Sequence, residues 1–438
     1  MLVAPARVPA TRRLAATLYG YAFLTDLVLL YPLYVLLFAD TGLSVGQIST
    51  LFVLWAVAGI LLEVPSGALA DALSRRLLLC LAPLLTAAGF ALWVLLPSYP
   101  AFAVGFLLWG AGGALRSGAL EALVFTELDR LGAADRYARL IGRTRTAEVL
   151  GAVGSGVLAG PVFAVGGYLA VGAASVATCL LAAAVAARFP EHRTAPAATA
   201  PAATASAATA SAAVAPLATP SAATPSAAVA SAAAPPSGPG EAPDDDEPGW
   251  LDSLRGGLAE VRADRAVRAA VLLVAAVAAI WGGLDEYTGL LARDTGVAEV
   301  TVPLLLLLVW AGMSVGGLLA PWGERLSRRG YAGLLVVAAG ALAAGALSRH
   351  PGGFLLLAVA FAAFQLATVL ADVRLQARIS GSARATVTSL AGMATDLTTV
   401  AFYGAYGLLA GAVGNPVAFA VAVLPYLLVA LWLFAGRG

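Results

Sequence analysis

The sequence predicts an all-α integral membrane protein with twelve transmembrane helices, arranged as two pseudo-symmetric six-helix bundles. Its 438 residues are 60% hydrophobic and only 12% charged, with a mean hydropathy of +0.88. Soluble domains are far more polar than this. Apolar runs of 18 or more residues recur along the chain, and about 20 residues of helix cross the hydrocarbon of a bilayer. Short polar signatures also recur in the same order in the two halves.

The apolar runs are too long and too uniform for the strands of a membrane barrel, so we expect helices. The predicted spans lie near 14–38, 46–66, 77–97, 101–125, 140–160, 167–188, 266–291, 300–320, 331–348, 353–376, 386–410 and 413–435.

A tract rich in Ala, Pro, Ser and Thr separates the sixth and seventh spans and has few large apolar residues to bury. Such a composition predicts a disordered linker. Leu251, Leu254, Leu258 and Val261 follow it with helical spacing, which indicates an amphipathic helix at the membrane surface. We therefore divide the chain into an N-terminal bundle (1–190), a cytoplasmic linker (191–249), and a surface helix with the C-terminal bundle (250–438).

Arginine distribution predicts the orientation. With the N-terminus inside, 23 of the 26 basic residues fall in segments assigned to the cytoplasm, and only Arg293 and Arg349 fall in outer loops. This bias predicts that both termini are cytoplasmic in a cell-membrane protein. The first apolar run contains Asp26 and no cleavage site follows it, so we interpret it as a retained first helix.

The internal repeat is visible in paired signatures. "ADTGLS" at Ala39–Ser44 ends the first span, and "RDTGVA" at Arg293–Ala298 ends the seventh. The loops after the second and eighth spans read D-x-L-S-R-R from Asp71 and E-x-L-S-R-R from Glu324. Duplicated bundles of this kind are a transporter architecture, with binding near the midplane between the repeats.

The stretch "GALADALSRR" at Gly67–Arg76 resembles the loop signature G-x-L-a-D-x-x-G-R-R of the major facilitator superfamily. The preceding "LEVPS" resembles the version in its drug-efflux-like branch, as do "SGALEAL" in the fourth span and "RATVTSL" before the eleventh. Gly166 and Gly167 come two residues later than in that family's antiporter signature.

This resemblance implies gating roles for the loop residues. The family's loop aspartate, here Asp71, contacts the start of the eleventh span in the outward-open state, where a carboxylate satisfies unpaired N–H groups. Arg75 and Arg76 would hold nearby acidic groups or anchor the loop to anionic headgroups. The full predicted gating set is Glu63, Gly67, Asp71, Arg75, Arg76 and Glu324.

Ionisable residues inside spans are functional candidates because each costs about 2.5–3.5 kcal/mol to insert. Asp26 lies halfway along the first span, and Arg116 is a possible counter-charge in the fourth. Asp285 and Glu286 are adjacent in the seventh span, about 100° apart on a helix, so we expect one of them to face a cavity. The predicted coupling and cavity set is Asp26, Arg116, Glu148, Asp285, Glu286 and Asp396.

Aromatic residues on the same spans would suit an amphipathic or cationic solute, although each could equally be a packing residue. They are Tyr19, Tyr21, Phe23, Tyr31, Tyr34, Trp281, Tyr287, Trp310, Phe364 and Tyr403.

The leading functional prediction is a monomeric secondary transporter that works by alternating access and exports a small amphipathic molecule, a drug or secondary metabolite, in exchange for protons. Uptake of a sugar, peptide or organic acid by the same fold is the second interpretation, and a sensor or scaffold that transports nothing is the third. No nucleotide-binding loop or paired histidine motif is present, so we expect neither a motor nor an enzyme. We expect no cofactor, no metal and no nucleic-acid partner.

Overall fold

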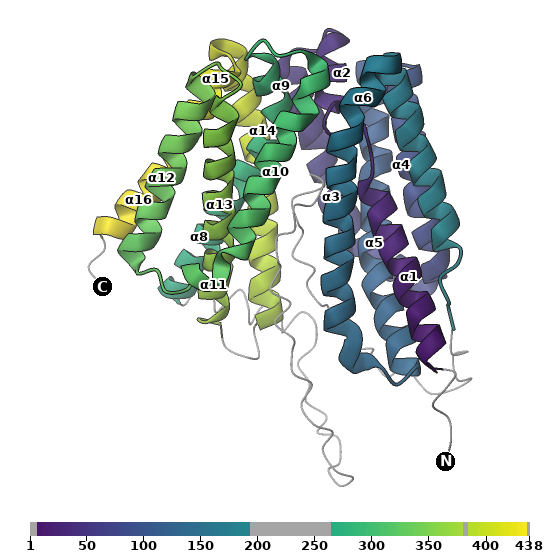
Figure 1. Ribbon diagram of the computed structural model, residues 1–438. Helices are drawn as coiled ribbons and strands as arrows, with labels where there is room; N and C mark the ends of the chain where they lie inside the picture. Colours follow the sequence, from purple (N-terminus) through teal and green to yellow (C-terminus); the bar gives the residue numbers. More distant parts are fainter. Residues whose placement is uncertain (1–6, 193–263, 380–383, 436–438) are drawn as a thin grey trace.

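The computed structural model describes residues 7–192, 264–379 and 384–435, and the described chain is helical throughout (Figure 1). Two groups of helices stand side by side, the N-half in purple to teal and the C-half in green to yellow. The N-half consists of α1 (Arg7–Asp26), α2 (Tyr34–Asp40), α3 (Val45–Ala72), α4 (Arg75–Leu95), α5 (Tyr99–Arg130), the short 3-10 helix η1 (Ala134–Arg136) and α6 (Tyr137–Ala186).

The C-half repeats this plan with more interruptions. It consists of α8 (Arg265–Asp285), α9 (Thr288–Arg293), η2 (Glu299–Thr301), α10 (Val302–Leu318), α11 (Ala320–Gly323), α12 (Arg328–Leu347), α13 (Gly353–Gln376), α14 (Arg384–Val413), α15 (Asn415–Val421) and α16 (Leu424–Ala435).

Twelve transmembrane helices in two bundles are what the sequence predicts, and the fold class is confirmed. Eight stretches of the described residues are long and apolar enough to cross a membrane, and one of them, 134–186, contains the predicted fifth and sixth spans. The first, fourth and eleventh spans are helical as α1, α5 and α14 and carry polar or charged residues. The predicted linker (191–249) and surface helix lie almost wholly outside the described residues.

Helix α6 contains two spans. Its 50 residues would extend about 75 Å as a straight helix, far more than one membrane crossing. The backbone leaves the helical region at Gly166 and Gly167, and Gly167 has a φ of 59°. Only glycine adopts that conformation without strain. The two glycines thus separate the fifth span from the sixth. They are the same glycines that come two residues later than in the family's antiporter signature.

The first span of each half is broken at an acidic residue. Helix α1 ends at Asp26, and seven residues separate it from α2. Helix α8 ends at Asp285, and only Glu286 and Tyr287 separate it from α9. Both breaks fall inside apolar runs, near 14–38 and 266–291, that the sequence predicts as the first and seventh spans. Interrupted helices at membrane depth are tolerated where the freed backbone groups find partners within the protein.

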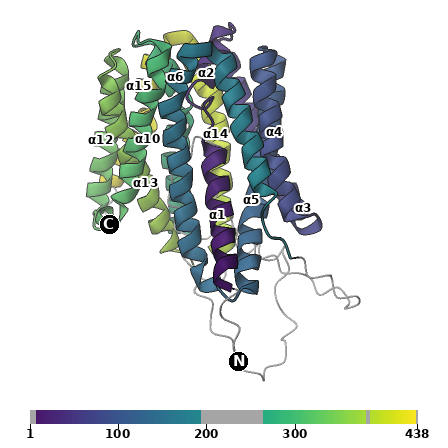
Figure 2. The same ribbon diagram turned by 45° about the vertical axis from the view of Figure 1, so that its right-hand side comes forward.

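The hydrophobic core differs between the two ends of the molecule. The "linker side" is the end where α1 begins, α6 ends and α8 begins; the "far side" is the end that carries α2, α9 and α15 (Figures 1 and 2). One large buried cluster includes residues of both halves, among them Phe52 and Tyr403. On the linker side the buried residues divide into a cluster confined to the N-half and another confined to the C-half.

Candidate functional site

Direct contacts hold the halves together on the far side. The Tyr34 hydroxyl donates a hydrogen bond to Glu286, and the hydroxyls of Ser49 and Tyr287 are 2.7 Å apart. Both pairs are buried. Helices α3 and α14 meet where Gly407 leaves no room for a side chain, since an added Cβ would lie 2.6 Å from Ser49. Each pair joins one half to the other, so these contacts must break if the far side opens.

A charged network lies at the far-side rim. The Arg293 guanidinium donates to Asp40 at 2.5 Å and to Glu299 at 2.9 Å, and Tyr168 donates to Asp40 at 2.5 Å. In the C-half, the Asn415 amide donates to Asp294 at 3.1 Å. Partial burial raises the pKa of Asp294, and the hydrogen bond from Asn415 opposes this shift. Asp40 and Asp294 are the equivalent aspartates of the repeated signatures.

Asp26 is buried at the end of α1 among charged neighbours. Its side chain accepts a long hydrogen bond, 3.4 Å, from Thr25. The positive charge of Arg116 acts on it without forming an ion pair among the described residues, and the negative charge of Glu148 acts on it in the opposite sense. Glu148 pairs instead with Arg145 at 3.1 Å, one turn away on α6. The fold thus brings together three of the predicted residues, from the first, fourth and fifth spans.

Helix α6 stabilises the break in the first span. Ser155 donates to the Val28 carbonyl at 2.5 Å, and Ser175 accepts from the Leu30 amide at 3.0 Å. These bonds satisfy backbone groups that the helix break leaves free. Gly151 lets α6 approach closely, because an added Cβ would lie 2.3 Å from the Phe23 carbonyl. Figure 2 shows α1 alongside α6.

Asp285 and Glu286 occupy different environments. Glu286 accepts the hydrogen bond from Tyr34 across the interface between the halves. Asp285 Oδ1 and Trp310 Nε1 are both buried without a hydrogen-bond partner among the described residues, although the two side chains lie close enough to interact. Both polar atoms of the Gln365 amide are also buried and unpartnered. Unsatisfied buried polar groups are costly and rare in folded proteins. The C-half therefore offers polar groups to a ligand.

Asp396 is partly buried on α14 and faces the other half. The negative charge of Glu63 on α3 acts on it across the interface. Glu63 is exposed. Its charge acts on Asp396 of the opposite half, and the sequence also predicts that it lies beside the gating loop. Like charges on facing helices repel, which favours separation of the two helices at this level.

The gating loop is only partly described. The Asp71 side chain lies outside the described residues. Arg75 donates to the Ala122 carbonyl at 3.1 Å and to Thr126 at 2.9 Å, and its amide donates to Glu191 at 2.7 Å. Arg75 thus joins the start of α4 to α5.

The remaining residues of the gating set contact little. Arg76 and Glu324 are exposed. Gly67 is partly buried, and a Cβ added to it would meet no atom within 4 Å.

The sequence analysis missed the far-side partners. Tyr34 appeared there only as one of many aromatic residues, and Ser49, Tyr168, Glu299 and Asn415 were not considered. The repeated D-T-G signature was the available signal, because its two aspartates, Asp40 and Asp294, both lie in this region.

Two six-helix repeats, each starting with a span broken at a buried acid, are features of secondary transporters. The chain belongs to the Major Facilitator Superfamily, whose sequence profile matches residues 16–348. Members of this family are transporters, not enzymes. No curated protein matches the chain.

Solved structures share the fold at low sequence identity. A variant of the nucleoside transporter NupG superposes with a TM-score of 0.70 at 11% identity, covering 96% of this chain and 99% of that one. A bacterial homologue of the human lysosomal transporter Spinster, in an inward-facing and unoccupied conformation, has a TM-score of 0.67 at 15% identity, with 99% and 97% covered. A D-xylose-proton symporter has a TM-score of 0.60 at 16% identity, with 97% and 96% covered.

Proposed function

We propose that this protein is a proton-coupled secondary transporter that exports a small amphipathic molecule by alternating access. The observation that carries the proposal is the division of the core, which is continuous between the halves on the far side and separate on the linker side. Two halves joined at one end and separable at the other form a two-state element, as alternating access requires. Arginine distribution supports a cytoplasmic linker side, and on that orientation the separated core clusters support an inward-facing assignment for this conformation.

Asp26 is the proposed proton carrier. It is buried at a helix break, where the acid Glu148 and the cation Arg116 act on it in opposite senses, and no ion pair with Arg116 forms among the described residues. A buried carboxyl group without a firm partner can hold a proton while closed off and release it to water when water or a cationic substrate reaches the site. Glu148 and Asp396 are the next candidates. Asp285, Trp310 and Gln365 provide the polar groups that would orient the solute.

Export is the proposed direction because the loop before the third span resembles the drug-efflux-like branch and because buried acids and aromatic residues suit an amphipathic cation. The nucleoside and xylose transporters named above are at most 16% identical to this chain and share its fold alone. Substrate identity therefore depends on experiment.

The test uses everted membrane vesicles that contain the full chain and an imposed pH gradient. Addition of ethidium and a panel of other amphipathic cations should release protons from the vesicles, and the uncoupled variant Asp26→Asn should abolish that release. Proton movement that accompanies sugars or peptides alone, in the uptake direction, would replace export with uptake. Proton release equal to that of empty vesicles for every solute would contradict transport.

A further inference from the structure

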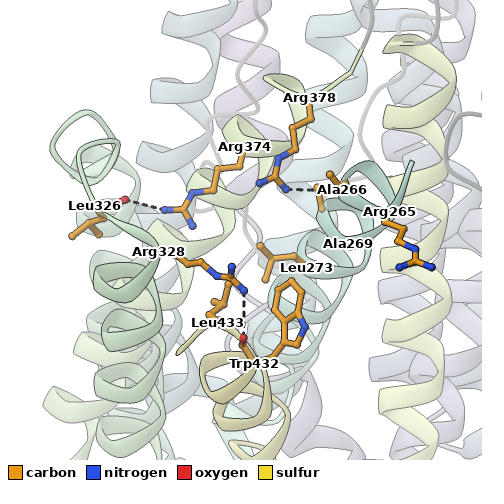
Figure 3. Close-up of a pocket in the computed structure, with 11 residues that line it drawn as sticks. Arg265, Ala266, Ala269, Leu273, Leu326, Arg328, Arg374, Arg378, Trp432 and Leu433 are labelled. Atoms are coloured by element: carbon orange, nitrogen blue, oxygen red, sulfur yellow. Dashed lines mark hydrogen bonds between the residues drawn. The ribbon is translucent and has the colours of Figure 1, made fainter. Parts of the chain in front are cut away.

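A basic pocket lies on the linker side of the C-half, away from the acids described above. Its volume is about 570 Å³, and it lies between the ends of α8, α12, α13 and α16 (Figure 3). Four arginines line it: Arg265, Arg328, Arg374 and Arg378. They come from three separate parts of the sequence, at the starts of α8 and α12 and at the end of α13, so the arginine distribution alone did not indicate a shared pocket.

These arginines have no carboxylate partners among the described residues. Three of them donate to backbone carbonyls instead: Arg374 to Leu326 at 3.1 Å, Arg328 to Trp432 at 3.4 Å and Arg378 to Ala266 at 3.4 Å. Figure 3 shows these three bonds converging around the pocket. The pocket therefore concentrates positive charge that the described protein does not neutralise.

Arg328 supplies a second, independent sign of a ligand. The residue is only partly buried, but its Nε is covered and has no hydrogen-bond partner among the described residues, while the guanidinium stacks over Trp432 with a distance of 5.2 Å to the ring centroid. A buried charged donor left unpaired is costly, and an anion in the pocket would satisfy it. Arg374 is held by stacking over Tyr331 at 4.2 Å, which fixes its guanidinium before any anion binds.

The apolar lining indicates that the anion belongs to a lipid. Leu273 and Leu433 line the pocket beside the arginines. Helix α16, which forms one wall, exposes Leu428, Leu431 and Trp432 by 66%, 63% and 53%. In a membrane protein such a face contacts acyl chains, and tryptophan near a helix end is typical of the headgroup level. A phosphate bound by the arginines would lie directly above hydrocarbon.

We propose that this pocket binds the phosphate group of an anionic phospholipid from the leaflet on the linker side, which the arginine distribution assigns to the cytoplasm. Basic pockets between transmembrane helices on that side suit anionic headgroups. The planar guanidinium of arginine pairs with two phosphate oxygens at once. In a zwitterionic lipid the ammonium group of the headgroup repels the arginines and weakens this pairing. The site is distinct from the proposed transport path and does not depend on the proposed function.

Native mass spectrometry of the full chain in detergent tests this proposal. Palmitoyl-oleoyl phosphatidylglycerol should bind more tightly than palmitoyl-oleoyl phosphatidylcholine. Each arginine near an anionic headgroup is worth about a fivefold gain in affinity. The double variant R328Q/R378Q should therefore bind phosphatidylglycerol roughly 25-fold more weakly. R329Q is the matched control, because Arg329 is the exposed neighbour of Arg328 and does not line the pocket.

A second variant keeps Arg328 and Arg374, which stack on aromatic rings, so that a loss of lipid binding is not caused by misfolding. R265Q removes a rim arginine that has no bond in the described structure, so the fold should be retained while affinity falls about fivefold. Equal binding of the two lipids, unchanged affinity in R328Q/R378Q, or an equal loss in R329Q would overturn the proposal. Displacement of the lipid by an equal concentration of inorganic phosphate would also overturn it, because the pocket would then be a site for free anions.

Discussion

The first spans of the two halves share a break but differ in the charges around it. Asp26 ends α1 with Arg116 and Glu148 acting on it, whereas no cation among the described residues acts on Asp285 at the end of α8. The N-half break is seven residues long and is held by serines of α6. The C-half break is two residues long, and its Glu286 accepts a bond from the opposite half. Equivalent positions of a duplicated fold have thus acquired different surroundings.

This difference suggests a division of labour. An acid balanced between a nearby cation and another acid can change protonation with little structural cost, which suits proton coupling. An acid that is hydrogen-bonded across the interface, as Glu286 is to Tyr34, stabilises the conformation in which the far side is closed. Making or breaking that bond shifts the balance between conformations, which suits gating. Variants of the two acids and of the residues that contact them test this division.

The largest effect is expected for Asp26→Asn against Asp285→Asn. With one proton exchanged per solute, a gradient of one pH unit sustains about a tenfold solute ratio. Asp26→Asn should reduce that ratio to one while downhill exchange continues, because the amide cannot release a proton. Asp285→Asn should keep coupling and change the KM for solute. Accumulation in vesicles measures both, and normal accumulation by Asp26→Asn would move coupling to Glu148, Asp396 or the Asp285–Glu286 pair.

Tyr34→Phe and Ser49→Ala compare how much a hydrogen bond to a carboxylate and a neutral hydrogen bond each stabilise the closed far side. Losing a hydrogen bond to a carboxylate costs about 1.5–3 kcal/mol, and losing a neutral one costs about 0.5–1.5 kcal/mol. Tyr34→Phe should therefore favour opening of the far side roughly tenfold or more, and Ser49→Ala less. Distances between spin labels on the two far-side rims report these populations. A larger shift for Ser49→Ala would contradict the gating role of Glu286.

Gly151→Ala should destabilise the N-half. Its Cβ would lie 2.3 Å from a backbone carbonyl, and overpacking of this kind costs about 1–3 kcal/mol. Gly283→Ala meets side-chain rings alone, Phe402 at 2.5 Å and Tyr403 at 3.4 Å, and should cost less because side chains can shift more easily than backbone. Gly142→Ala, with no atom within 4 Å, is the matched control on α6 and should be neutral or slightly stabilising. Thermal unfolding in detergent ranks the three, and equal melting temperatures would show that α6 can move away from α1.

Arg293→Gln should have a smaller effect on opening than Tyr34→Phe. Arg293 and Asp40 are 30% and 36% exposed, and exposed ion pairs contribute at most about 1 kcal/mol. The shift should be below about fivefold and should shrink further at high salt. Arg349→Gln, in the other outer loop, is the control. A shift that is large and insensitive to salt would mean that this network holds the halves more firmly than the buried pairs.

Deletion of about 30 residues within 195–240 should leave transport unchanged. A flexible chain of about 55 residues spans roughly 40 Å, so a shorter tether still joins the halves. Transport rates and surface expression of the deletion variant check this. Loss of transport with normal insertion would show that the tract does more than connect the two halves compared here.

The sequence by itself determined the membrane architecture. Hydropathy fixes the spans because bilayer thickness imposes a length on every helix, and α13 begins and ends where the apolar run does. The duplication could be read from the paired signatures. The acids Asp26, Asp285 and Glu286 could be identified because charge within an apolar run is conspicuous, whatever its partners.

Only the tertiary structure decided what those acids contact. Tyr34 and Glu286 are 252 residues apart in the chain, and no local pattern predicts a bond between them. The break after Asp26 depends on Ser155 and Ser175, which supply hydrogen bonds from another helix. The arginines of the basic pocket likewise come from α8, α12 and the end of α13, and α16 forms a fourth wall. Hydropathy is a property of each segment alone, whereas partners depend on how the segments pack.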